Sequence, residues 1–162
     1  MLFLFVSIVI GIMVFNKSEE IIIPNDGIRM RIIANSNNIQ DLYQKKKIKE
    51  SIQDNIYEII KNSKSKDEVR HNIKNNLEKI DLIVSNKISD YSINYGVNYF
   101  PKKSYKGVIY PEGNYESLVI TLGSGLGDNW WCVLYPPLCL INDNENTSDV
   151  EYRSIIYDIV NN

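Results

Sequence analysis

The spacing of apolar residues changes near the middle of this chain, and this change constrains the fold more than any other feature of the sequence. Between residues 39 and 62, apolar side chains such as Ile48, Ile52 and Ile56 recur every three or four positions, which predicts an amphipathic helix. Between residues 93 and 99 they recur at every second position, which predicts a strand covered on one face. The sequence thus places a helical segment before a run of strands.

Turn and capping signals divide the rest of the chain into further elements. Apolar and cationic residues alternate at residues 28–32, which predicts a strand ahead of the first helix. Ser65 followed by Glu68 forms a capping box, and we expect it to start a second helix that runs to about Asp90. A short final helix is expected after the acidic loop near the C-terminal end. Further strands are expected at residues 105–110, at residues 117–122 and from Trp130 onward, with a turn at residues 111–114.

This order of elements predicts an α+β protein. We expect a largely antiparallel sheet with two amphipathic helices packed on one face, preceded by an N-terminal hydrophobic segment. Because two helices cover only one side of such a sheet, the chemistry of the other side bears on the function of the protein.

The first fifteen residues, MLFLFVSIVIGIMVF, contain no charged side chain and are followed by the polar sequence NKSEE. An apolar run of this length lies between the hydrophobic part of a signal peptide and the roughly 20 residues that span a bilayer. A buried core helix is the alternative, although a small domain would have to surround it on every side. We expect residues 1–16 to be a signal peptide or membrane anchor and residues 25–162 to form a single extracytoplasmic α+β domain.

Charge and cysteine content exclude some partners. The chain has 18 Lys and Arg against 20 Asp and Glu, a formal net charge of -2, so we expect no nucleic-acid partner. Its two cysteines, Cys132 and Cys139, have no histidine or third cysteine nearby, so we expect no metal and no cofactor. In an oxidising compartment a disulfide between them would bridge the arms of a hairpin whose tip is Tyr135–Pro136. The alternative is two small buried hydrophobic side chains.

The stretch GLGDNWWCVLYPPLC, residues 125–139, contains both tryptophans and both cysteines of the chain. Side chains alternate across a strand, so Trp130 and Trp131 face opposite sides of the sheet. If Trp130 is structural and enters the helix-covered core, Trp131 stands on the uncovered face, where a large aromatic ring with a polar N–H group is typical of protein interfaces. The alternative is that the tail or the loop at residues 100–107 folds over Trp131.

The glycines at positions 123, 125 and 127 do not match a phosphate-binding loop, because no Lys-Ser or Lys-Thr follows and the next expected element is a strand. We expect them to let the chain turn sharply and approach a neighbouring segment closely. The same stretch lacks the Gly-x-Ser-x-Gly elbow of many hydrolases, and the cysteines lack a histidine base. Asp128 has no second carboxylate in an Asp-Thr-Gly setting, so we expect that the protein is not an enzyme.

Several of these stretches together resemble the stage II sporulation protein R family of endospore-forming Firmicutes. The resemblance rests on IRMRIIANS at residues 28–36, the helix that begins near Gln40, the block at residues 110–139 and the leading apolar segment. It implies a forespore protein exported into the space between the two membranes of the sporulating cell, anchored through its N-terminal segment if that segment is not cleaved. There it would activate a membrane-embedded aspartic protease of the mother cell, which processes the precursor of an early mother-cell sigma factor.

The residues and the resemblance both favour a ligand that signals by contact. Two other classes of function stay open: a secreted hydrolase whose site the sequence does not reveal, and a secreted glycan-binding or wall-associated module that uses its exposed aromatic rings. For the signalling ligand, we expect the partner-binding surface to consist of Asp128, Asn129, Trp131, Tyr135, Pro136 and Pro137.

Overall fold

The computed structural model describes residues 21–138 and 156–160. Helical backbone is present at residues 156–160, within the expected final helix. The start of that helix, Cys139 and the expected signal peptide or anchor at residues 1–16 lie outside the described residues. In the two described ranges, no helix is both long and apolar enough to cross a membrane.

The larger sheet has four strands in the order β3, β6, β2, β7. Pairs β3–β6 and β2–β7 are antiparallel, and the central pair β2–β6 is parallel. The chain passes from β2 to β6 through helices and other strands, and a long connection of this kind allows neighbouring strands to run parallel. The predicted α+β class is confirmed, with a mixed sheet. The strands are β2 (Ile28–Ile33), β3 (Tyr91–Phe100), β6 (Gly113–Leu122) and β7 (Asn129–Tyr135).

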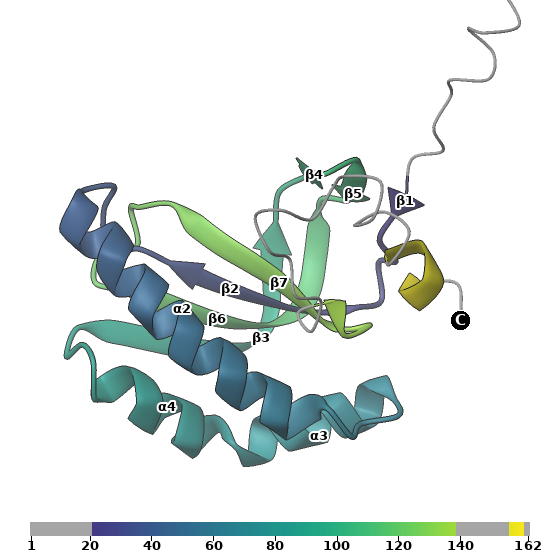
Figure 1. The fold of residues 1–162 in the computed structure, drawn as a ribbon, viewed down its shortest axis with the longest axis horizontal. Helices are drawn as coiled ribbons and strands as arrows, with labels where there is room; N and C mark the ends of the chain where they lie inside the picture. The colour runs from purple at the N-terminus through teal and green to yellow at the C-terminus, as the bar shows by residue number, and fades with distance from the viewer. Residues whose placement is uncertain (1–20, 139–155, 161–162) are drawn as a thin grey trace, which may run out of the picture.

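Three helices lie against one face of this sheet: α2 (Ile39–Ile60), α3 (Lys66–Asn75) and α4 (Leu77–Ser85) (Figure 1). The predicted first helix agrees with α2, but the predicted second helix is two helices. The break lies at Asn76, whose side-chain Nδ2 donates to the carbonyl of Asn72 at 2.8 Å. Asparagine favours such local bonds, which compete with a continuous helix. Between sheet and helices lies an isoleucine-rich core that includes Ile32, Ile48, Ile52, Ile73, Ile80 and Ile120.

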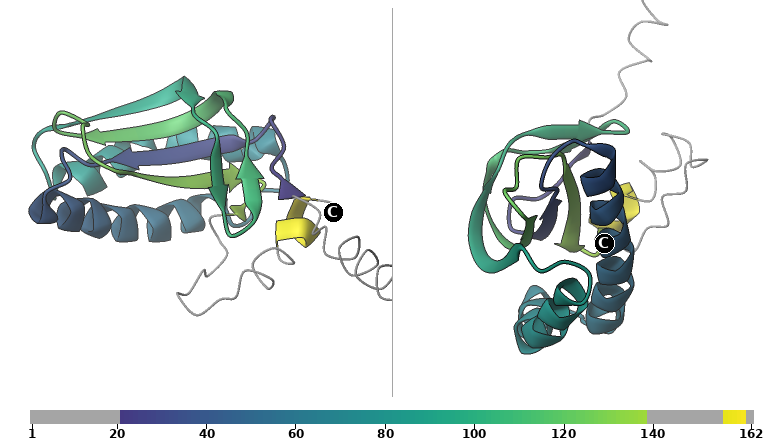
Figure 2. Two further views of the ribbon diagram at one scale, coloured as in Figure 1. Left: turned by 90° about the horizontal axis from the view of Figure 1, so that it is seen from above. Right: turned by 90° about the vertical axis from the view of Figure 1, so that its left-hand side faces the viewer.

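A smaller sheet of β1 (Ile21–Ile22), β5 (Val108–Tyr110) and β4 (Lys103–Tyr105) lies near one end of the larger one. Figure 2 shows it on the same end of the molecule as residues 156–160. The single strand predicted at residues 105–110 is therefore wrong. Lys106 and Gly107 both have positive φ, 47° and 77°, which closes the tight β4–β5 hairpin. Likewise, the predicted turn at residues 111–114 is shorter, because β6 already begins at Gly113.

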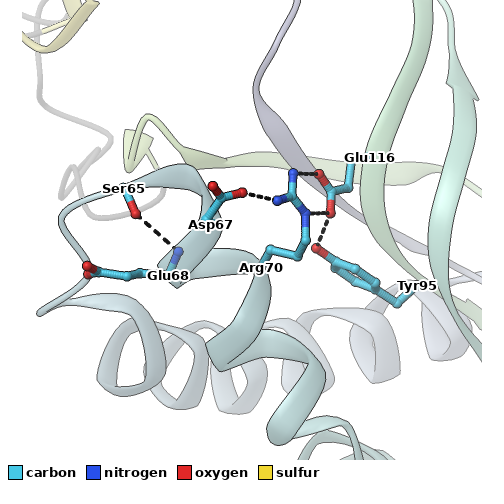
Figure 3. A network of polar contacts seen from close by, with 6 residues as sticks. All are labelled: Ser65, Asp67, Glu68, Arg70, Tyr95 and Glu116. Carbon is cyan, nitrogen blue, oxygen red and sulfur yellow. Dashed lines mark hydrogen bonds and ion pairs between the residues drawn. The ribbon is translucent and has the colours of Figure 1, made fainter.

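An ion pair connects helix α3 to the larger sheet (Figure 3). Its Arg70 donates from Nε and Nη2 to the two carboxylate oxygens of Glu116 on β6, at 2.6 and 2.8 Å. The Tyr95 hydroxyl of β3 donates to the same carboxylate at 2.8 Å. At the start of α3, the Glu68 N–H donates to Ser65 Oγ at 3.2 Å, which confirms the predicted helix cap. Arg70 thus joins a helix to the inner strand β6, and Tyr95 of the outer strand β3 shares the same carboxylate.

This ion pair predicts a loss of stability in acid. The Arg70 guanidinium holds the pKa of Glu116 below its ordinary value of 4.5, against the opposing effect of burial. A lowered folded-state pKa means that the stabilisation is fully present above the unfolded value and is lost as the pH falls through the folded value. We therefore expect Glu116→Gln to reduce the free energy of unfolding by about 1 to 2 kcal/mol at pH 7.

In urea titrations, the difference between Glu116→Gln and the native chain should shrink as the pH falls below 4.5. A difference that stays constant down to strongly acidic pH would show that the carboxylate charge does not contribute.

Candidate functional site

The face of the larger sheet opposite the helices carries two arginines. On β2, Met30 and Ile32 pack in the helix-side core, so Arg29 and Arg31 lie on the other face. Trp131 of β7 is the register partner of Arg31 and shares this face. We call this side of the sheet the open face.

The two arginines form a cluster with three aromatic rings, here called the arginine–aromatic cluster: Arg29, Arg31, Phe100, Tyr115 and Trp131. The Arg29 Cζ atom lies 3.3 Å from the centroid of the Tyr115 ring, and the Arg31 Cζ atom lies 4.9 Å from that of Phe100. The Phe100 and Trp131 rings meet edge to face with centroids 5.2 Å apart. Guanidinium groups are attracted to the electron-rich faces of such rings, so the rings hold both arginines in place.

The cluster contains hydrogen-bond donors without acceptors. In the part of the chain that the structure describes, the buried side-chain nitrogen and oxygen atoms that lack a partner are Nε and Nη2 of Arg29, Nε of Arg31 and Nε1 of Trp131. Arg29 makes one bond, from Nη1 to the carbonyl of Pro111 at 3.3 Å. All four atoms therefore belong to one face of one sheet. Unpaired buried donors are uncommon in folded proteins and call for an explanation.

Neither arginine is paired with a carboxylate among the described residues. Burial lowers the pKa of Arg29 and of Arg31, but a guanidinium still carries its charge at neutral pH. The open face therefore holds two positive charges that no negative side chain of the described residues neutralises. Burying an unpaired charge costs free energy in a folded protein, and such costly groups cluster at functional sites.

The cluster is closed at one end and accessible at the other. Arg29 is 2% exposed, and Phe100 and Tyr115 beside it are also buried. Arg31 and Trp131 are partly exposed. Lys103 of β4 is exposed, and its Nζ atom lies 5.1 Å from the Trp131 ring. A partner would thus meet Arg31, Trp131 and Lys103, with the charge of Arg29 beneath them.

The structure brings together only some of the residues predicted for the site. Asn129 and Trp131 share the open face, and Asp128 precedes them in an exposed position. Tyr135, Pro136 and Pro137 lie at the other end of β7, about 20 Å from Asn129 at the usual rise per residue. Tyr135 also packs against the helix-side core. The described geometry thus separates the predicted residues into two groups.

The two tryptophans lie on opposite sides of the sheet. Trp130 packs against the helix-side core, and the Nζ atom of Lys49 on α2 lies 5.2 Å from its ring. The loop at residues 100–107, which the alternative interpretation placed over Trp131, covers part of this side chain through Phe100 and Lys103. Because Trp131 is still partly exposed, this cover leaves part of the ring accessible.

The expectation that the glycines permit a close approach is confirmed. The Gly127 N–H donates to the carbonyl of Ala34 at 2.9 Å, and the Leu126 N–H donates to that of Asn35 at 3.0 Å. The Ser124 N–H donates to Asn35 Oδ1 at 2.9 Å. The glycine loop therefore lies directly against residues 34–38, which connect β2 to α2, and this contact fixes the ends of β2 and β7 relative to each other.

The connection at residues 34–38 is organised by one carboxylate. Asp41 in the first turn of α2 accepts from Ser36 Oγ at 2.6 Å and from Asn35 Nδ2 at 2.9 Å. These bonds lower the pKa of Asp41, with the Ser36 bond as the largest cause. Asn38 caps the helix by accepting from the Asp41 N–H at 2.8 Å. The polar cluster in the sequence thus serves to start α2 and to receive the glycine loop.

The hairpin predicted around Tyr135–Pro136 is described only as far as Leu138. One edge of β7 pairs with β2. After β7, the Leu138 N–H donates to the carbonyl of Pro136 at 2.7 Å, so the chain makes a tight turn there, and the rest of the returning arm lies outside the described residues. Cys132 faces the helix-side core. Because Cys139 lies outside the described residues, its disulfide with Cys132 stays a prediction.

The two arginines were not predicted as site residues. The alternating pattern at residues 28–32 contained the signal, because two arginines spaced two apart on a strand point to the same face. The contribution of Phe100, Tyr115 and Lys103 depends on how distant strands come together. Among residues 21–138 and 156–160, no group of three or more potential metal ligands is present.

The fold and the site together define a mixed α+β protein with a candidate binding face on the sheet side that the helices leave open. The chain belongs to the stage II sporulation protein R family: the family model of that description matches residues 24–145. It is 36% identical over 133 residues to "Stage II sporulation protein R" of Bacillus subtilis (strain 168). The match covers 78% of this chain and 59% of that relative. No solved structure matches the chain.

The family predicted from the residues is therefore confirmed, and membership implies a role in sporulation. Two of the stretches that carried the resemblance, residues 28–36 and the described part of residues 110–139, meet in the structure. They supply the neighbouring strands β2 and β7 and the two loops that contact each other. The arginine–aromatic cluster lies where they come together.

Proposed function

We propose that this protein is an exported sporulation signal made in the forespore. Its residues from about 25 onward act in the space between the forespore and mother-cell membranes. There they activate a membrane-embedded aspartic protease of the mother cell, which processes the precursor of an early mother-cell sigma factor. The protein itself breaks no bond and acts by contact.

The observation that carries this proposal is the arginine–aromatic cluster. A surface that offers charged and aromatic groups with unused donors is suited to binding another protein, because Arg and Trp supply much of the energy of protein interfaces. Family membership supports the setting in sporulation. The described face presents Arg31 and Trp131 side by side and thus has the chemistry of a contact surface.

Activation by contact requires a difference in affinity. The signal must bind the active arrangement of the protease more tightly than the idle one, because equal affinity for both shifts no equilibrium. A rigid surface suits this requirement, because it cannot repack to fit the idle arrangement as well as the active one. The paired strands β2 and β7 and the loop contact that joins their ends provide this rigidity.

Trp131→Ala in sporulating cells tests the proposal. We expect the variant to be exported at normal levels and to reduce processing of the sigma-factor precursor at least about tenfold, as for a central interface residue. Immunoblots of the precursor and of the exported protein measure both quantities. Tyr57→Ala is the matched control, since Tyr57 is an exposed aromatic on α2 that also has a lysine over its ring.

Cells that carry the Tyr57→Ala control should process the precursor to the same extent as native cells. Normal processing by an exported Trp131→Ala variant, or an equal loss in both variants, would refute the assignment of the contact surface.

A further inference from the structure

The open face carries more positive charge than the described residues around it can neutralise. Arg29 and Arg31 lie on adjacent same-face positions of β2, and Lys103 extends over Trp131 from β4. No described carboxylate pairs with either arginine. The chain as a whole has a net charge of -2, so this local excess of positive charge is not a property of the overall composition.

Two of the unpaired donors point to an anion that accepts hydrogen bonds. They are Nε of Arg31 and Nε1 of Trp131, buried atoms of side chains that are themselves partly exposed. Arg29 is 2% exposed, so its unpaired Nε and Nη2 atoms lie too deep to bond to the same anion. An acceptor at the accessible end of the cluster would face Arg31, Trp131 and Lys103 together.

The walls of the cluster restrict the kind of anion. Phe100, Tyr115 and Trp131 surround the arginines with aromatic surface, which favours a ligand with apolar groups next to its charge. The chain has a formal net charge of -2 and thus lacks the large excess of positive charge that is typical of proteins that bind a polyanion such as nucleic acid or an acidic membrane. A guanidinium matches the planar geometry of a carboxylate and binds it with two parallel bonds.

We propose that the open face binds an acidic side chain in an apolar segment of a protein partner, with the carboxylate held between Arg31 and Lys103 beside the Trp131 ring. Arg29 lies too deep for direct contact and strengthens the attraction through its charge. This inference gives the chemistry of the partner in the proposed function and rests on that function for the identity of the partner.

Peptide binding to the purified full-length chain in a non-ionic detergent tests the inference. The probe is a capped pentapeptide with a central glutamate flanked by phenylalanine and leucine. We expect it to shift the NMR signals of the Trp131 indole N–H and the Arg31 Nε–H, with an affinity that falls as salt is added. The same peptide with glutamine should bind at least about tenfold more weakly, because it lacks the charge.

Variants of the chain locate the site. Arg31→Gln should weaken binding of the glutamate peptide at least about tenfold, and Arg31→Lys should retain part of it, because lysine keeps the charge but loses the planar fork. Lys61→Gln is the control, since Lys61 pairs with Glu58 on α2, and should bind as the native chain does. If Arg31→Gln has the same melting temperature as the native chain, its weaker peptide binding is not caused by unfolding.

Three results would overturn the inference: equal binding of the glutamate and glutamine peptides, tighter binding of a phosphoserine peptide, or shifts that leave Trp131 and Arg31 unaffected. The test is separate from that of the proposed function. If the glutamate peptide binds as expected but the Trp131→Ala variant still triggers processing, the carboxylate site stands and the assignment of the open face as the signalling surface is wrong. If the peptide does not bind but Trp131→Ala abolishes processing, the carboxylate site is wrong and the assignment of the open face as the signalling surface stands.

Discussion

Replacing Arg29 by methionine is expected to leave the protein as stable as the native chain, or more stable by up to about 2 kcal/mol, while impairing the signalling that we propose. Arg29 is 2% exposed and has no carboxylate partner among the described residues. Keeping such a charge in the interior costs free energy, whereas methionine fills a similar volume and packs well against aromatic rings. The substitution removes one hydrogen bond, which Arg29 donates to the carbonyl of Pro111.

Signalling should fall about tenfold or more in Arg29→Met. A unit charge about 8 Å from a bound carboxylate contributes about 2 kcal/mol at the effective dielectric constant of a protein surface. Urea unfolding measures the stability of the purified chain, and immunoblots of the sigma-factor precursor measure signalling. A variant that loses several kcal/mol of stability would show that Arg29 is a structural residue, and native signalling by a stable variant would show that its charge has no role in binding.

The second large effect is expected at Gly127. A Cβ atom there would lie 2.4 Å from the carbonyl oxygen of Ser36 and 2.8 Å from the Ala34 Cβ atom. Both contacts are too close, so the glycine loop would have to separate from residues 34–38. We expect Gly127→Ala to reduce the free energy of unfolding by about 2 to 4 kcal/mol, through overpacking and lost loop hydrogen bonds.

Gly96→Ala is the matched control. A Cβ atom at Gly96 would meet nothing closer than Asn94 Oδ1 at 3.5 Å, and alanine in a strand is favoured over glycine by about 0.5 to 1 kcal/mol. This variant should therefore be as stable as the native chain or slightly more so. If thermal unfolding shows equal effects for both substitutions, the contact between the two loops does not stabilise the fold.

The elements that local sequence determines were predicted well. The isoleucine spacing predicted α2, and the capping box predicted the start of α3. The alternation of side chains along a strand predicted that Trp130 and Trp131 lie on opposite faces. The break at Asn76 and the β4–β5 hairpin were missed, because each depends on one or two residues within a longer apolar pattern.

The candidate site was predicted less well, for a topological reason. Its members come from four strands, and the parallel pairing of β2 with β6 brings Arg29 next to Tyr115. No local pattern indicates such a pairing. Trp131 was found because it is unusual by itself, whereas Arg31 opposite it is identified only by the register of β2 and β7.

The most direct test of contact signalling is cleavage of the sigma-factor precursor in membranes that contain the aspartic protease, after addition of the purified full-length chain. Contact signalling predicts cleavage only when the protease and the native chain are both present, and little cleavage when the chain carries Trp131→Ala. Cleavage by the chain without the protease, or equal cleavage with the Trp131→Ala chain, would contradict it.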